Sequence, residues 1–267
     1  MGKYHSTEEL EEKGMHQFFV EQHQIGKEYV TITGSDVNHI RNVLRMKPGE
    51  KIRVSDQQGE DYFCEIAEIG EDFVQADIVS QDQAGTELPS KLYLFQALPK
   101  GDRMETVIEK AVELGVYEII PVAMKYCVVK LDEKKAAAKV KRWQAIAESA
   151  AKQSKRSRIP QIHPVMSFRE ATAYAMQCDI RLVPYENERG MAGTKEALKK
   201  LAPGKSVSIM IGPEGGFAEE EITAVRPDME VISLGKRILR TDTAGICTMS
   251  LLMLELESMA EAGNEME

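Results

Sequence analysis

Short runs in which apolar and polar residues alternate occupy the first third of the chain. The strand-like runs are 18–20, 29–32, 51–55, 62–66 and 73–79. Because successive side chains of a strand point to opposite faces, several short runs of this kind predict a small β-barrel. One helix interrupts them: Ser35 is its expected N-cap, and apolar residues recur at helical spacing from Val37 to Leu44.

From residue 92 onward, strand-like runs alternate with helical segments. The runs of strand length are 92–97, 117–122, 180–185, 207–211 and 230–234. Helical periodicity covers 102–114, which Gly115 is expected to cap, and 134–153. This alternation predicts βαβ units in a mostly parallel sheet. Residues 81–90 carry no periodicity and are expected to link the two parts.

Two loops that follow consecutive strands have the most unusual sequences. Residues 212–217 read Gly-Pro-Glu-Gly-Gly-Phe, and residues 235–245 read Gly-Lys-Arg-Ile-Leu-Arg-Thr-Asp-Thr-Ala-Gly before an apolar helix. Open α/β sheets bind ligands in loops at the carboxyl ends of parallel strands, and glycines let the backbone approach a ligand closely. A tight turn that needs a positive φ is the alternative interpretation of Gly215 and Gly216.

Composition bounds the class of protein. With 267 residues, 43% of them hydrophobic, the chain has room for two domains with sizeable cores. We divide it into a flexible extension (1–14), the barrel (15–84), a second domain (85–260) and an acidic tail (261–267). The sequence has neither an apolar run long enough for a membrane span nor a signal-peptide pattern, so we expect a cytoplasmic protein. The 4 cysteines are widely spaced without a CxxC pattern, which predicts reduced thiols and no metal site.

Charge is distributed unevenly along the chain. The net charge of −9 argues against a nucleic-acid partner, because phosphate contacts need clustered lysines and arginines. Residues 91–163, however, carry 15 lysines and arginines against 8 acidic residues. This cluster favours RNA binding, although a helical face exposed to solvent explains the same excess.

The two glycine-containing loops together resemble a known family. Residues 211–217 and 234–244 are similar to the paired motifs of the RsmE group of SPOUT methyltransferases, and the resemblance extends from about residue 15 to about residue 256. It implies a knotted α/β SPOUT methyltransferase domain, with a trefoil knot near the C-terminus, behind an N-terminal PUA-like small β-barrel. Two positions depart from the family pattern: Asp242 stands where glutamate is usual, and Gln17 where arginine is common.

The resemblance also implies a reaction, which is S-adenosylmethionine-dependent methylation of N3 of a uridine in 16S ribosomal RNA. N3 carries a weakly acidic proton on the pairing edge of the base, so the base must be unpaired and must lose that proton. Arg240 is the expected stabiliser of the resulting negative charge, and Glu214 and Asp242 are the acid–base candidates. A helix N-cap is an equal alternative for Asp242. The residues expected to bind the cofactor S-adenosyl-L-methionine are Gly212, Pro213, Gly215, Gly216, Leu234, Gly235, Ile238, Leu239 and Thr243.

The expected partners are 16S rRNA or the small ribosomal subunit, and a second copy of the chain. The residues expected to hold RNA are Arg45, Lys100, Arg103, Arg156 and Arg158. The last two follow the long helix and are expected in an exposed loop, while a surface arginine without an RNA contact is the alternative for Arg45. The family forms homodimers, and apolar residues on one side of the last helix, from Met249 to Leu256, fit either the dimer interface or an internal core.

Two other functions fit the same residues. Ribose 2′-O methylation of ribosomal RNA is a sister activity among SPOUT enzymes. A non-catalytic RNA-binding or ribosome assembly factor would keep the pocket without the reaction. The small N-terminal barrel and the second loop motif favour base methylation by resemblance.

Overall fold

The computed structural model describes residues 15–82 and 85–264 of the chain, which divide into two compact units. The expected extension at 1–14 and the last three residues of the acidic tail lie outside this range. The first unit comprises the described residues up to Glu87 together with Ala151–Ile159, and the second comprises Leu88–Ala150 and the described residues from Pro160 onward. Residues 151–159, expected in the second domain, therefore belong to the first unit.

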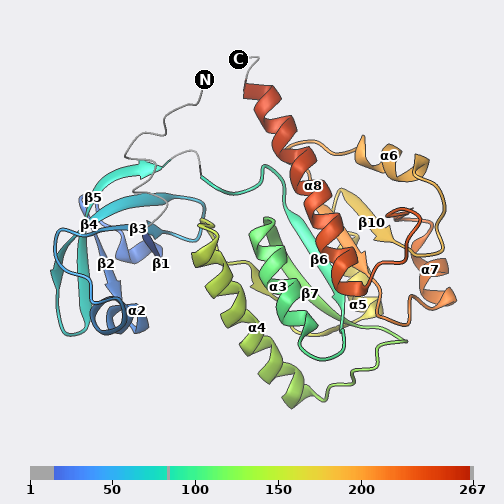
Figure 1. Ribbon diagram of the computed structural model, residues 1–267, viewed down its shortest axis with the longest axis horizontal. Helices are drawn as coiled ribbons and strands as arrows, with labels where there is room; N and C mark the ends of the chain where they lie inside the picture. Colours follow the sequence, from blue (N-terminus) through green and yellow to red (C-terminus); the bar gives the residue numbers. More distant parts are fainter. Residues whose placement is uncertain (1–14, 83–84, 265–267) are drawn as a thin grey trace. The chain divides into compact units, whose positions relative to one another are not determined.

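The first unit is a five-stranded sheet around one hydrophobic core (Figure 1). Its strands are β1 (His16–Phe19), β2 (Tyr29–Thr33), β3 (Lys51–Ser55), β4 (Asp61–Ile69) and β5 (Phe73–Asp82), in the order β1-β3-β4-β5-β2. β1 pairs with β3 in parallel, and the other pairs are antiparallel. The alternation in the sequence is borne out by burial, since Val30 and Ile32 of β2 and Ile52 and Val54 of β3 point into the core.

The helix between β2 and β3 differs from its predicted form. Gly34, with a φ of 74°, is the N-cap, and Ser35 is the first residue of α2 (Ser35–Asn38). The chain continues as a π-helical segment, η2 (His39–Leu44), and ends at Arg45 in the left-handed region with a φ of 56°. The N-cap falls on glycine because that residue adopts a positive φ without a steric penalty. A short 3₁₀ segment, η1 (Gln22–Gln24), precedes β2.

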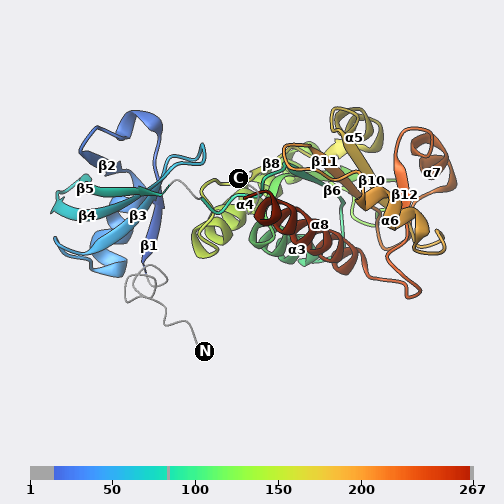
Figure 2. The same ribbon diagram turned by 90° about the horizontal axis from the view of Figure 1, so that it is seen from above.

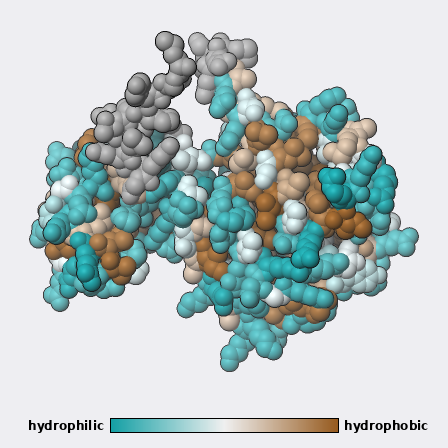
Figure 3. Space-filling model, viewed as in Figure 1, coloured by the Kyte–Doolittle hydropathy of each residue, from teal (hydrophilic) through white to brown (hydrophobic). Residues whose placement is uncertain are grey.

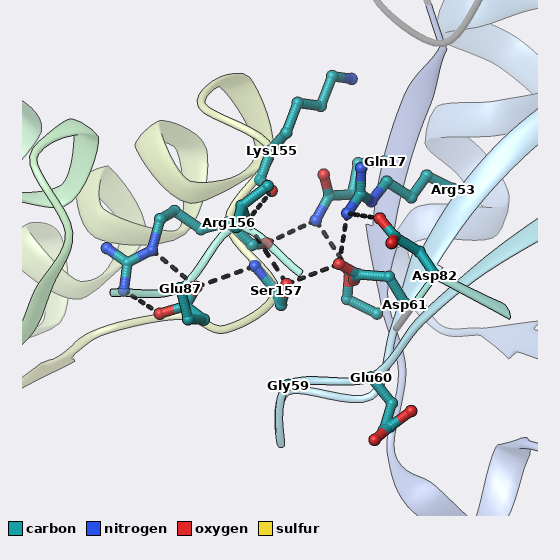
Figure 4. Close-up of polar contacts among 12 residues, drawn as sticks. Gln17, Arg53, Gly59, Glu60, Asp61, Asp82, Glu87, Lys155, Arg156 and Ser157 are labelled. Carbon is teal, nitrogen blue, oxygen red and sulfur yellow. Dashed lines mark hydrogen bonds and ion pairs between the residues drawn. The ribbon is translucent and has the colours of Figure 1, made fainter. Parts of the chain in front are cut away.

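A buried polar network joins residues 151–159 to the strands of the first unit (Figure 4). The Ser157 hydroxyl donates to Asp61 Oδ2 over 2.6 Å, and Asp61 also accepts from Arg53 over 2.5 Å. Gln17 Nε2 donates to the backbone oxygen of Arg156 over 2.6 Å. Because Asp61, Arg156 and Ser157 are almost fully buried, these contacts make the segment part of the first unit's interior.

The second unit is built on a parallel sheet. Its strands are β6 (Leu92–Ala97), β7 (Val116–Ala123), β8 (Gln161–Ile162), β10 (Ile180–Pro184), β11 (Val207–Ile211) and β12 (Glu230–Ile232), in the order β12-β10-β11-β6-β7-β8, while β9 (Met166–Ser167) pairs with β7. All five residues of β11 are buried. This explains its continuous apolar run, because a central parallel strand is covered on both faces.

Helices cover both faces of this sheet. They are α3 (Arg103–Glu113), α4 (Glu133–Gln153), α5 (Phe168–Ala175), α6 (Ala192–Leu198), α7 (Glu219–Val225) and α8 (Thr241–Asn264). Figure 2 shows α3 and α8 on one side of the sheet and α5 on the other. α5 was not among the helices expected from periodicity, although Ser167 and Glu170 form its capping box and are spaced as that motif requires.

The apolar side of α8 is mainly an internal core. Met249, Leu252 and Leu256 are completely buried within the chain, whereas Leu254 is 59% exposed. Cys64, Cys127 and Cys178 are buried free thiols, and burial raises the pKa of Cys178 to about 11. Across the described ranges, no helix is long and apolar enough to cross a membrane, and no group of three His, Cys, Asp or Glu side chains is placed to hold a metal ion.

Candidate functional site

A pocket of about 540 Å³ lies in the second unit at the carboxyl ends of three strands. It is lined by residues 184–186 after β10, 211–217 after β11 and 234–235 with 237–241 after β12, together with Arg103 and Ala244. Its volume falls within the roughly 300–1,000 Å³ that is usual for small-molecule sites. The two loops singled out in the sequence therefore do meet at one pocket.

Strand order explains why a third loop joins them. β10 lies between β11 and β12 and pairs with both in parallel, so the carboxyl ends of all three strands share one edge. This places Tyr185 and Glu186 in the pocket wall. Neither residue was expected at the site, because spacing along the chain does not reveal which strands are neighbours.

The loop after β11 is both a tight turn and a pocket wall. The Gly216 amide donates to the Pro213 oxygen over 2.9 Å, and Gly216 has a φ of 75°. A Cβ added at Gly212 would lie 2.8 Å from the Phe217 ring, and one added at Gly215 would lie 2.9 Å from Tyr126 Cβ. A side chain at position 215 is thus excluded by the protein's own Tyr126.

Glu214 fastens this loop to the start of α3. Its Oε1 accepts from the Lys100 amide over 2.9 Å and from the Arg103 guanidinium over 3.1 Å. Two of the residues expected to hold RNA thus contact one of the expected catalytic acids. Glu214 lies in the pocket lining, but one of its oxygens is already engaged by these two donors.

The loop after β12 presents both apolar and basic side chains. Leu234, Ile238 and Leu239 line the pocket, and Ile238 is 82% exposed. Arg240 lines the pocket as well, and its guanidinium forms no ion pair with any residue that the structure describes. A cation at the pocket rim suits a ligand on which negative charge develops. Arg237, which the sequence analysis did not select, lies in the same lining.

Thr241 joins the two loops. Its hydroxyl donates to the Gly212 oxygen over 2.6 Å and accepts from Gln96 Nε2 over 2.9 Å, and the residue is 5% exposed. Thr241, the first residue of α8, therefore links this helix to the β11 loop and to the central strand β6. Thr243, and not Thr241, was the threonine expected from the sequence to bind the cofactor.

Asp242 and Thr243, which follow Thr241, lie outside the pocket lining. α8 begins at Thr241, and the Ala244 amide donates to the Arg240 oxygen, so Asp242 stands in the first turn and is not the N-cap. Thr243 is exposed, and neither Asp242 nor Thr243 lines the pocket. Asp242 Oδ1 is buried without a hydrogen-bond partner in the described part of the chain.

The basic residues expected to hold RNA have different environments. Arg45 and Lys100 are exposed, and Arg158 is half-buried. Arg156 is only 2% exposed, and its guanidinium forms two hydrogen bonds to Glu87, of 2.8 and 2.5 Å (Figure 4). The expectation that Arg156 lies exposed in a loop is therefore wrong, because the segment that carries it is folded into the first unit.

Comparisons with known proteins assign both parts of the chain to known families. Residues 86–253 match the model of an RNA methyltransferase domain, and residues 32–79 match that of an RNA methyltransferase PUA domain. The protein named ribosomal RNA small subunit methyltransferase E from Bacillus subtilis (strain 168) is 38% identical over 231 residues, covering 85% of this chain and 90% of the relative.

Solved structures agree with this assignment. The crystal structure of a ribosomal RNA small subunit methyltransferase E from Neisseria gonorrhoeae, bound to S-adenosyl methionine, has a TM-score of 0.77 at 31% identity and covers 90% of this chain and 97% of that one. A Legionella pneumophila methyltransferase in complex with the same cofactor has a TM-score of 0.76 at 29% identity, again covering 90% and 97% of the two chains.

Proposed function

We infer the function from the family to which this chain belongs, the ribosomal RNA small subunit methyltransferase E family, and propose that it methylates N3 of a uridine in 16S ribosomal RNA with S-adenosylmethionine as the donor. Members of this family are RNA methyltransferases. The observation that carries the proposal to this chain is the pocket in which the loops after β10, β11 and β12 meet. Both loops of the family resemblance line it.

The pocket fits S-adenosylmethionine by size and by the chemistry of its walls. The turn at 212–216 offers backbone groups close to the pocket, and Leu234 and Leu239 offer apolar side chains for the faces of an adenine ring. The Glu186 carboxylate adds an acceptor for hydroxyl or cationic groups. When bound, this cofactor supplies a methyl group that its sulfonium charge has already activated.

The protein's own residues must then orient the base and manage its proton. Arg240 lies in the pocket lining without an ion-pair partner among the described residues, so it is available to stabilise negative charge on the uracil oxygens. Glu214 and Asp242 both stay candidates for the proton acceptor. Glu214 would have to act while its Oε1 accepts from two donors. Asp242 has a buried oxygen with no hydrogen-bond donor among the described residues, but it lies outside the pocket lining.

The decisive experiment maps methylated nucleotides in 16S ribosomal RNA by mass spectrometry. RNA from cells that lack the protein is treated with the purified wild type or with an Arg240→Ala variant. We expect one N3-methyluridine to appear with the wild type, and its rate of formation to fall by roughly 10²-fold or more with the variant. A new ribose 2′-O-methyl group would support the sister activity instead, and an unchanged methylation pattern would support a non-catalytic assembly factor.

RNA binding by residues of both units is part of the proposal. Arg45 of the first unit and Lys100 of the second are exposed, so each can neutralise a phosphate, whereas Arg158 is half-buried and Arg103 is partly exposed but already paired with Glu214. Arg156 is removed from this set because Glu87 already neutralises it inside the first unit. The ribosomal RNA substrate also implies a cytoplasmic location and the small ribosomal subunit as the assembly in which the target lies.

We further propose that the chain forms a homodimer and that residues 207–245 contain the trefoil knot that the family resemblance implies. Support for the dimer comes from α8, whose Leu254 is 59% exposed although Leu252 and Leu256 of the same helix are buried. Hydrophobic surface is visible in Figure 3 over the region that α8 occupies in Figure 1. Crystallographic tracing of residues 207–245 tests the knot.

A further inference from the structure

Arg237 is, like Arg240, an exposed cation of the pocket lining. It belongs to the loop after β12, which has no regular secondary structure. Its guanidinium forms neither a hydrogen bond nor an ion pair with any residue that the structure describes. Because a guanidinium has several N–H donors and no acceptor, this side chain is available to bind an anion in the pocket.

The acidic side chains of the lining do not neutralise Arg237. Glu214 accepts from Arg103 over 3.1 Å, so its charge is already paired. The Glu186 carboxylate lies against the turn after β11, in space that a side chain at the last glycine of that turn would need. Over the described ranges, no ion pair joins Glu186 to Arg237 or to Arg240. The pocket therefore has two arginines without a neutralising carboxylate.

Two uncompensated cations do not suit a site for S-adenosylmethionine alone. That cofactor carries a sulfonium and an ammonium charge against one carboxylate, so its net charge is positive. Like charges in one pocket repel each other, and they do so more strongly where water is excluded. We therefore expect the two guanidiniums to contact anionic groups that arrive with the second substrate, the RNA.

The RNA brings two kinds of negative charge to this pocket. One develops on the uracil oxygens as N3 loses its proton, and Arg240 is the residue proposed to stabilise it. The other is the permanent charge of the phosphates on either side of the target nucleotide. A guanidinium binds two phosphate oxygens at once through parallel N–H bonds. Arg237 is the remaining unpaired arginine of the lining, and it suits this permanent charge.

We propose that Arg237 binds a phosphate next to the target uridine. The inference rests on the proposed function and deepens it, because this contact fixes the backbone of the nucleotide whose base must leave the stack. Arg237 thus positions the nucleotide, whereas Arg240 acts on its base. The contact belongs to the pocket of methyl transfer itself, since Arg237 lines that pocket and the exposed Arg45 and Lys100 do not.

A nucleotide with a phosphate on each side tests this contact without methyl transfer. Uridine 3′,5′-bisphosphate and uridine are titrated separately into the protein and followed by NMR. S-adenosylhomocysteine, which is the cofactor without its donor methyl group, is kept saturating. Arg237→Gln removes the charge in question. The matched control is Lys236→Gln, which removes the charge of the preceding exposed residue, outside the pocket lining.

We expect the wild type and Lys236→Gln to bind the bisphosphate more tightly than uridine. Arg237→Gln should lose roughly fivefold in affinity for the bisphosphate, the size of one charged contact exposed to solvent, and nothing in affinity for uridine. A wild type without a preference for the bisphosphate overturns the proposal, and so does an Arg237→Gln variant that keeps the full preference. An equal loss in Lys236→Gln also overturns it, because the effect is then a general field of positive charge.

The carboxylate of the cofactor is the alternative anion for Arg237. Calorimetry separates the two sources with S-adenosylhomocysteine, which carries that carboxylate, and 5′-methylthioadenosine, which lacks it. The proposal requires the wild type and Arg237→Gln to have equal affinity for both compounds, and weaker binding of S-adenosylhomocysteine alone in the variant contradicts it. Failure of the proposed function is distinguishable, because in that case the wild type leaves N3 of every uridine in ribosomal RNA unmethylated, whatever the bisphosphate does.

Discussion

The Thr241 hydroxyl connects three parts of the second unit at one residue. It donates to the Gly212 oxygen in the β11 loop, accepts from Gln96 of β6 and stands at the start of α8. Because Gln96 and Thr241 are both buried, losing this hydroxyl leaves polar groups without partners. The geometry of the pocket therefore depends on the two hydrogen bonds that the Thr241 hydroxyl makes within the protein.

Replacing Thr241 tests this dependence. Thr241→Val keeps the shape but removes both hydrogen bonds, so we expect the free energy of unfolding to fall by about 1–3 kcal/mol and the affinity for S-adenosylmethionine to weaken, as measured by calorimetry. Thr241→Ser should restore both. The matched control is Thr243→Val, which alters an exposed residue of the same helix. Equal affinity in the wild type and Thr241→Val would rule out the anchoring role.

Tyr174 carries a pH-dependent contribution to stability. Burial, and then the hydrogen bond of 2.7 Å from its hydroxyl to Glu118, raise the pKa of Tyr174 above its ordinary value of 10.0. Since the folded state holds this proton more tightly than the unfolded state, the stabilisation is complete below pH 10 and is lost as the pH rises above 10 toward the folded-state pKa.

Tyr174→Phe should therefore lower the free energy of unfolding by about 1 kcal/mol at pH 8, because one hydrogen bond is lost. Urea unfolding of both proteins, repeated at increasingly alkaline pH, should show this difference shrinking above pH 10. The exposed Tyr29, changed to phenylalanine, is the control. A difference between wild type and Tyr174→Phe that grows with pH would contradict the assigned direction.

Among the structural elements, the segment at 151–159 is tied to a part of the chain remote in sequence. Arg156 is held by Glu87, and their side chains are 3% and 24% exposed. A buried ion pair adds little over an apolar pair of similar size, but removing one partner leaves an uncompensated charge. The energetics of the first unit should therefore depend on whether one or both partners are replaced.

A double-mutant cycle measures this dependence. We expect Glu87→Ala to destabilise the first unit by about 3 kcal/mol, and Glu87→Ala with Arg156→Met to recover at least half of that loss. Hydrogen exchange of the β3 and β4 amides reports on the first unit, with β11 as an internal reference. The exposed pair of Glu196 and Lys199 is the control, since Glu196→Ala should cost no more than about 1 kcal/mol. Strictly additive losses at Glu87 and Arg156 would argue against a coupled pair.

Across the molecule, the net charge is −9, yet Arg45 and Lys100 are exposed basic residues that can contact RNA phosphates. Arg45→Ala and Lys100→Ala should each lower the slope of log affinity against log salt by roughly one, measured by fluorescence anisotropy with a ribosomal RNA fragment. The exposed Lys199, changed to alanine, is the matched control because Glu196 already neutralises it. If all three variants keep the wild-type slope, the basic residues are only a solvated face.

Self-association is tested on α8. Leu254 is 59% exposed on this helix, so a charge at that position should oppose packing of a second copy and leave the core residues in place. We expect light scattering at micromolar concentration to give a dimer for the wild type and a monomer for Leu254→Glu. Glu257→Lys, on the same helix, controls for the change of charge. A monomeric wild type refutes the dimer, and a dimeric Leu254→Glu moves its interface away from this residue.

The sequence alone determined the local elements and the chemical class of the protein. Alternation with a period of two located β2 and β3, and the continuous apolar runs located β6 and β11, because burial on one face or on both leaves its pattern in adjacent residues. The loops at 212–217 and 235–245 were recognisable for the same reason. Each motif is a run of consecutive residues, and the two motifs together identified the family.

Which of these residues lie together follows from packing between distant parts of the chain. The insertion of β10 between β11 and β12 brings Tyr185 and Glu186 into the pocket, and the start of α8 selects Thr241 in place of Thr243. Arg156, expected from the sequence to contact RNA, is instead buried in an ion pair with Glu87. The physical reason is common to these cases: strand order, helix phase and burial follow from packing between residues far apart in the chain, and no local spacing encodes which partner will be near.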